Sequence, residues 1–142
     1  MVAIESIKNF FKTSDILVAE NKYITVDSVK DDYDNVSVQL TGMTPSIYED
    51  CLGLKHVNGW SINFNLFVYS NIEGQSEAMH NNMFTQNLSL WLTEKNIKNE
   101  LPVLLEGFET ATLTPSNIGL FERHDNGNCI YLIQCKANLR AL

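Results

Sequence analysis

The most regular pattern in the chain is the alternation of apolar and polar residues between positions 60 and 69. The apolar positions are Trp60, Ile62, Phe64, Leu66 and Val68. Because successive side chains of a strand point to opposite faces of a sheet, this alternation predicts a long strand with one buried face. The other face begins polar and becomes aromatic at Phe67 and Tyr69, so we expect a helix or another subunit to cover that end.

A long helix is predicted from about residue 77 to residue 98, because apolar residues recur there at helical spacing. They form two stripes on adjoining faces: Phe84, Leu88, Trp91 and Leu92 in the first, and Met79, Met83, Leu90 and Ile97 in the second. One stripe should pack on the sheet. We expect the second to meet a short amphipathic helix predicted over residues 3–12, with a neighbouring subunit as the alternative partner. The Leu101-Pro102 pair should end the long helix.

Four further strands are predicted from alternating, β-branched segments at residues 23–27, 35–41, 118–123 and 129–139. The acidic segment between the first two, which holds Asp31, Tyr33 and Asp34, is interpreted as a solvated hairpin loop. The last two strands flank Asn126-Gly127, a strong hairpin signal. Cys135 shares one face of the last strand with other apolar residues, so its thiol is interpreted as core filling.

Residues 42–59 show little periodicity and include three glycines and a proline, which predicts a long loop, with a stray strand inside it as the alternative. Tyr48, Glu49 and Cys51 lie within it. Long loops inside compact domains are usually functional. This one is therefore either a contact with a neighbouring subunit or a plain surface excursion.

Composition bounds the class of protein. A chain of 142 residues that is 44% hydrophobic can bury one ordinary core, which predicts a single domain over residues 1–142. The net charge of −7 argues against nucleic acid as a binding partner, but it is compatible with lining a conduit that DNA passes without sticking. We see neither a secretory signal nor a membrane span, and the three cysteines fit a reducing compartment, so we expect a cytoplasmic protein without membrane contact.

No phosphate loop, metal-ligand cluster or nucleophile motif occurs, so the sequence predicts no enzyme, no metal site and no cofactor. The remote enzymatic alternative is a thiol and imidazole pair, Cys51 with His56, oriented by Glu49 or Asp50. His80 and His124 have no companion at ligand spacing, and both are interpreted as structural or exposed residues.

The order of elements in the second half carries a resemblance to a known family. In sequence they are the strand at Trp60 to Tyr69, the helix at Leu88 to Lys95, Leu101-Pro102, Gly119-Leu120-Phe121 and the strand around Ile133-Gln134-Cys135. This order resembles the small "minor capsid" or tail-terminator proteins of phages and prophages of Gram-positive hosts. The resemblance covers roughly residues 59–139.

The resemblance implies an α+β domain, with a mixed or antiparallel sheet packed by an N-terminal helix and one long central helix. It also implies a structural virion protein of the tail or neck, whose ring, with six subunits expected, caps the tail tube and stops its growth. Partners would be further copies of the chain, the tail-tube protein and a head-tail connector or stopper, with DNA only passing through the lumen. A head-completion, stopper or connector adaptor protein is the alternative within the same class.

Specific residues are assigned from the hydrophobic patterns together with this resemblance. The expected subunit or tube interface is Asp31, Tyr33, Asp34, Tyr48, Glu49, Met79 and Met83. The expected core is Trp60, Phe64, Phe84, Leu88, Trp91, Phe121, Tyr131, Ile133 and Cys135.

Overall fold

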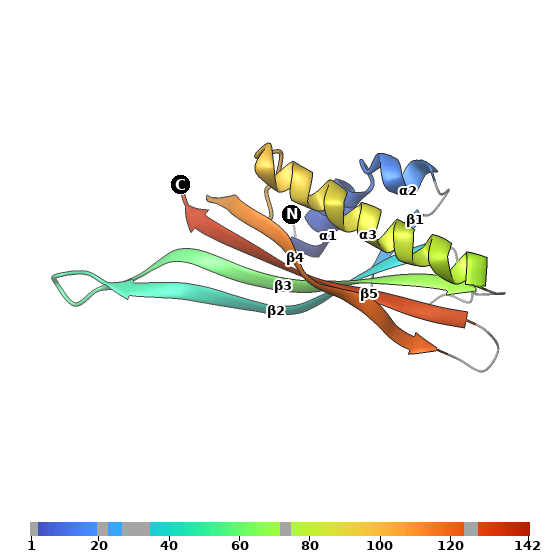
Figure 1. Cartoon of the computed structure of the whole chain (residues 1–142). Coiled ribbons are helices and arrows are strands. Elements are labelled where there is room, and N and C mark those ends of the chain that lie inside the picture. The colour runs from blue at the N-terminus through green and yellow to red at the C-terminus, as the bar shows by residue number, and fades with distance from the viewer. Residues whose placement is uncertain (1–2, 20–22, 27–34, 72–74, 124–127) are drawn as a thin grey trace.

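The computed structural model describes residues 3–19, 23–26, 35–71, 75–123 and 128–142. The elements, in chain order, are α1 (Ala3–Phe11), α2 (Asp15–Ala19), β1 (Tyr23–Val26), β2 (Asn35–Glu49), β3 (Lys55–Asn71), α3 (Gln75–Ile97), β4 (Phe108–Arg123) and β5 (Asn128–Ala141). The strands form one sheet in the order β1-β2-β3-β5-β4, and the helices lie on one face of it (Figure 1). The expected α+β class, with a mixed sheet, an N-terminal helix and a long central helix, is confirmed.

The core lies between this sheet and the helices. β3 and β5 pair antiparallel in a register that sets Phe64 opposite Cys135 and Leu66 opposite Ile133. Every second residue from Ile62 to Val68 of β3 and from Tyr131 to Leu139 of β5 therefore points toward the helices and is buried. The other face of the same two strands is polar and exposed at Asn63 and Lys136, whereas its apolar cross-strand pair, Phe67 and Leu132, is only partly exposed. One face of the sheet is thus covered and the other is open.

The first stripe of α3 faces this core, as the helical spacing predicts, and Phe84, Leu88, Trp91 and Leu92 are all buried. α1 packs on the same stripe. The rings of Phe10 and Phe11 have their centroids 5.1 Å and 5.8 Å from that of Trp91, and the ring of Phe11 also meets Phe64.

The second stripe of α3 does not meet the N-terminal helix, so that expectation is wrong. Met83, Leu90 and Ile97 are exposed, and the side chain of Leu90 is 65% accessible. The reason is that α1 occupies the side of α3 that carries Trp91, where it can also reach the sheet. The second stripe is left facing outward.

The predicted loop at 42–59 is also wrong, because β2 and β3 run through it as one long antiparallel hairpin. Gly42 marks a register shift in β2. Pro45 is tolerated because β1 pairs only with residues 35–38, which leaves the outer edge of β2 without a partner among the described strands. At Gly59 a Cβ would overlap the carbonyl oxygen of Leu139, so the glycine marks a close backbone approach. Only residues 50–54 form the turn.

Two other features of the strands differ from the sequence expectation. β1 and β2 are parallel neighbours, and parallel strands cannot be joined by a hairpin, so the hairpin interpretation of the acidic segment is wrong; residues 27–34 themselves lie outside the described residues. β4 begins at Phe108, ten residues early, because Pro115 lies on an edge strand where it costs little. The predicted end of the long helix near residue 98 is confirmed, since α3 ends at Ile97 and Asn99 follows with φ 56°.

Candidate interaction surface

A two-stranded projection is the most distinctive surface of the molecule. β5 pairs with β3 only as far as Gly59, so residues 46–58, here named the arm, extend beyond the rest of the sheet. Figure 1 shows the arm leaving the body at the end opposite the β4–β5 hairpin. From position 43 to position 58 every residue except Asp50 is exposed, so both faces of the arm are open to solvent. Isolated two-stranded hairpins are marginally stable in water, which favours a role in which a partner covers the arm.

The arm carries large apolar side chains on both faces. Ile47 and Val57 are cross-strand partners on one face, and Tyr48 lies opposite His56 on the other. The turn adds Leu52 and Leu54, and Leu52 is 81% accessible. Clusters of exposed apolar residues on soluble proteins mark interaction sites.

The turn of the arm is held in a defined conformation by Asp50. Its Oδ1 accepts the backbone N–H groups of Leu52 and Leu54 at 2.9 Å and 3.0 Å, and its Oδ2 lies 2.7 Å from Nε2 of His56. Gly53 supplies the left-handed residue that the turn needs, with φ 80°. The hydrogen bond from His56, with those from the two backbone groups, lowers the pKa of Asp50 below its usual value. A turn ordered in advance loses less conformational entropy when it binds.

The predicted interface residues fall in three places. Tyr48 and Glu49 lie on the arm and are exposed. Met83 is exposed on α3, and Met79 lies one turn earlier in the same helix. Asp31, Tyr33 and Asp34 lie outside the described residues, and their role stays a prediction.

The residues assigned to the core are also placed by the structure. Phe64, Phe84, Leu88, Trp91, Tyr131, Ile133 and Cys135 are buried, whereas Trp60 is only partly buried against the same cluster. Burial raises the pKa of the Cys135 thiol far above its usual range, which suits a core side chain. Phe121 belongs to β4, and its side chain is outside the described set.

A second candidate surface is the outward face of α3. The sequence from position 78 to position 93 contains no Asp, Glu, Lys or Arg. The exposed side chains in this run are amides, a threonine and apolar residues: Asn82, Met83, Gln86, Asn87, Leu90 and Thr93. A surface helix normally presents charged residues to water. A charge-depleted, partly apolar face is instead typical of the centre of a protein interface.

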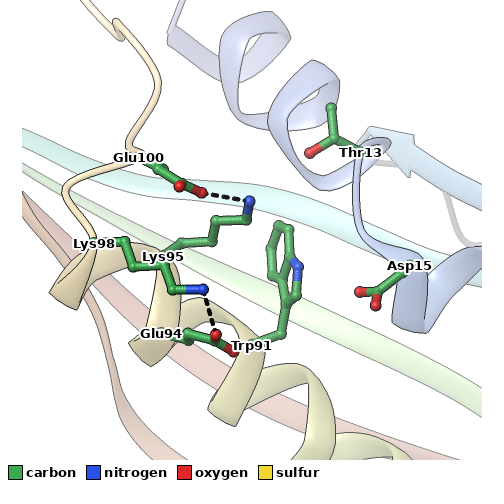
Figure 2. A pocket seen from close by; sticks show the side chains of 7 residues that line it. All are labelled: Thr13, Asp15, Trp91, Glu94, Lys95, Lys98 and Glu100. Atoms are coloured by element: carbon green, nitrogen blue, oxygen red, sulfur yellow. Dashed lines mark hydrogen bonds and ion pairs between the residues drawn. The ribbon is translucent and has the colours of Figure 1, made fainter.

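A pocket of about 250 Å³ lies between the C-terminal end of α3 and the segment that joins α1 to α2 (Figure 2). Its charged groups are largely paired with each other: Lys95 Nζ lies 2.8 Å from Glu100 Oε2, and Lys98 Nζ lies 2.7 Å from Glu94 Oε1. Lys95 also sits 5.8 Å from the ring centroid of Trp91, which forms one wall. Because both lysines are neutralised within the pocket, we find no reason to assign it an anionic ligand.

The remote thiol and imidazole pair is not assembled. Cys51 and His56 both lie in the arm, and Asp50 does contact the histidine as the orienting group was expected to do. Within the described residues, however, no hydrogen bond joins the Cys51 thiol to the imidazole. The His56 ring instead stacks on Tyr48, with centroids 5.2 Å apart. These contacts explain His56 as part of a structural turn.

The described residues also bear on other classes of site. They contain no group of three or more His, Cys, Asp or Glu side chains that could hold a metal ion. None of the described helices is both long enough and apolar enough to cross a membrane.

Comparison with known proteins places the fold. No family model matches the sequence, and no curated protein matches it. Among solved structures, the chain is similar to a chain of the virion of a native gene transfer agent particle, with a TM-score of 0.62 and 14% sequence identity. The match covers 96% of this chain and 93% of the other. The two chains therefore share a fold over nearly their whole lengths.

Proposed function

We propose that this chain is a structural subunit of a phage-like virion and, more specifically, a tail terminator. The observation that carries the proposal is the likeness to a chain of a gene transfer agent virion over 96% of the sequence. It agrees in class with the resemblance read from the order of elements between residues 59 and 139.

The surfaces described above suit a subunit whose work is association. The arm is exposed on both faces, and α3 presents a second uncharged face. A monomeric protein gains nothing from keeping such surfaces in water, because burial of apolar area is the main favourable term in association. In a closed ring each copy would cover the surfaces of its neighbours.

A terminator ring must bind the growing tube on one face and must not bind a further tube ring on the other face. In the proposed assembly, one face of the ring matches the last ring of tube subunits and the opposite face receives the head connector. The net charge of −7 suits a lumen through which DNA passes without binding. The chain would act in the host cytoplasm during assembly and then stay in the tail or neck of the particle, with no catalytic step.

The test is the length of tails in particles assembled with this gene disrupted, measured by electron microscopy. We expect overlong tubes without heads, and restored length when the intact gene is supplied in trans. Tails of normal length beside empty or leaking heads would overturn the terminator assignment. They would favour the second candidate, a head-completion, stopper or connector adaptor protein.

A further inference from the structure

Most of the exposed large apolar side chains gather in two separate parts of the described structure; Val18, Val103 and Leu142 lie outside both. One is the arm with the strand leading into it, and the other is the outward stripe of α3, formed by Met83, Leu90 and Ile97. The helix lies over the sheet, whereas the arm projects past the C-terminal end of that helix (Figure 1). A hairpin held by a continuous strand ladder cannot fold back onto α3 of its own chain, so neither surface can cover the other within one molecule.

The partner of these surfaces must tolerate an acidic chain. Two copies of a protein with net charge −7 repel each other over most of their surfaces. The repulsion is least where charged residues are absent, and α3 has none from position 78 to position 93. In the arm the charged side chains are confined to the turn end, where Asp50 is already bonded to His56. The two apolar surfaces are therefore places where a second copy can approach.

Their dimensions also match. Residues 43–49, which are the end of β2 that leads into the arm and forms its first strand, span six strand rises, or about 20 Å. Residues 83–97 of α3 span fourteen helical rises, or about 21 Å. One face of this segment can therefore lie along the whole length of the stripe.

The sheet edges are poorer candidates for joining copies. The two long edge strands, β2 and β4, contain Pro45 and Pro115, and both are interrupted by register shifts. Prolines and bulges are the devices by which proteins prevent strand addition at exposed edges. Contact through side chains is therefore favoured over extension of the sheet.

We propose that the arm of one copy of this chain packs along the outward face of α3 of the next copy. Different surfaces of the two copies meet, so the contact repeats head to tail and can close into a ring. The inference deepens the proposed function and rests on it, since it names the surfaces that build the ring. It places Ile47, Val57 or Leu52 of one copy on the stripe that contains Leu90 of its neighbour.

A native thiol makes the contact measurable. Cys51 is exposed at the turn of the arm, whereas Cys135 is buried. In a Cys129→Ser background, Leu90→Cys supplies a second thiol on the α3 stripe, and a short bis-maleimide is added to purified particles. We expect covalent dimers and higher multimers on a denaturing gel, with peptides linking Cys51 to position 90 identified by mass spectrometry. Removing the native thiol with Cys51→Ser should abolish these multimers.

The control places the new thiol on the open face of the sheet with Lys136→Cys, because Lys136 is exposed there. At least tenfold less linkage than at position 90 is expected. Links from Cys51 mainly to position 136, links only between two Cys51 thiols, or no link at position 90 in intact particles would each overturn the proposed contact.

A second variant tests the contact through assembly. Leu90→Glu places a charge on the uncharged face of α3, and we expect at least a tenfold loss of incorporation into particles with an unchanged thermal unfolding midpoint. Undiminished incorporation would contradict the proposal. If the gene disruption gives overlong tails but Cys51 does not link to position 90, only this contact is overturned. If Cys51 links to position 90 but the gene disruption gives tails of normal length, only the terminator role is overturned.

Discussion

Trp91 offers the sharpest test of how the helices are held to the sheet. Its side chain is 9% exposed and lies between α3 and α1. The rings of Phe10 and Phe11 pack against it, with centroids 5.1 Å and 5.8 Å away. Trp91→Ala should therefore remove the contact through which α1 docks, in addition to opening a cavity in the core.

The size of the effect follows from the area buried. A buried tryptophan removes roughly 150–250 Å² from water, and at about 25 cal/mol per Å² this is worth about 4–6 kcal/mol. Alanine recovers part of this, roughly 0.5 kcal/mol, through its higher helix propensity. The expected loss of unfolding free energy is about 3–5 kcal/mol, which agrees with measured costs of removing large aromatic side chains from cores. Since domains are stable by only about 5–15 kcal/mol, the variant should be partly or wholly unfolded.

Urea unfolding followed by circular dichroism measures this. With a slope of roughly 2 kcal/mol per molar urea, the midpoint should fall by about 1.5–2.5 M. Leu90→Ala is the matched control, because the neighbouring Leu90 faces outward and its loss should change stability by no more than about 0.5 kcal/mol. The urea unfolding midpoint of Trp91→Phe should lie between those of Trp91→Ala and Leu90→Ala. A Trp91→Ala variant as stable as the Leu90→Ala variant would refute the assignment of α1 and α3 to one shared core.

Two further outcomes are expected of the arm and its root. Gly59→Ala should destabilise the protein by about 1–3 kcal/mol, because its methyl group would overlap a backbone carbonyl of β5, whereas Gly42→Ala has open space and should be nearly neutral in the same urea assay. His56 is the chief cause that holds the pKa of Asp50 below its ordinary value of 3.8. The ionised carboxylate should therefore stabilise the turn fully above pH 3.8, and this stabilisation should be lost as the pH falls through the lower pKa of the folded state. His56→Ala should raise the Asp50 pKa toward 3.8 in a carboxyl titration followed by NMR, and an unchanged midpoint would show that the backbone donors alone lower it.

The parts of the fold that the sequence predicts well are those in which one face of an element is buried. Alternation fixed the faces of β3 from Phe64 to Val68, and the 3.6-residue spacing found the buried stripe of α3 from Phe84 to Leu92. In both, the choice between core and solvent repeats along the element, so the period is visible. The β4–β5 hairpin is antiparallel, as the Asn-Gly pair indicates.

The arm could not be predicted in this way because neither of its faces is buried in a single copy. Without a core to select one face, apolar residues occur on both, as at Ile47 and Tyr48. Gly42, Pro45 and Gly59 then look like breaks in structure. In the folded chain they are a bulge, an edge-strand proline and a close approach of two backbones. A weak signal was present, since residues 43–48 contain three apolar positions at every second residue, Met43, Pro45 and Ile47.

The proposed contacts with other copies would explain why large apolar side chains stay exposed in a single copy of the chain. Exposure of Leu90 and Ile97 to water does not stabilise the folded chain. The buried stripe around Trp91 already holds the helix to its own sheet. An apolar stripe that the fold does not need, on a helix without charged residues from position 78 to position 93, favours a partner outside the chain. The same reasoning applies to the arm, whose turn is fixed by Asp50 although none of the other described residues covers it. If both surfaces serve one head-to-tail contact, charge introduced at either should weaken assembly to a similar extent, and combining the two changes should add little.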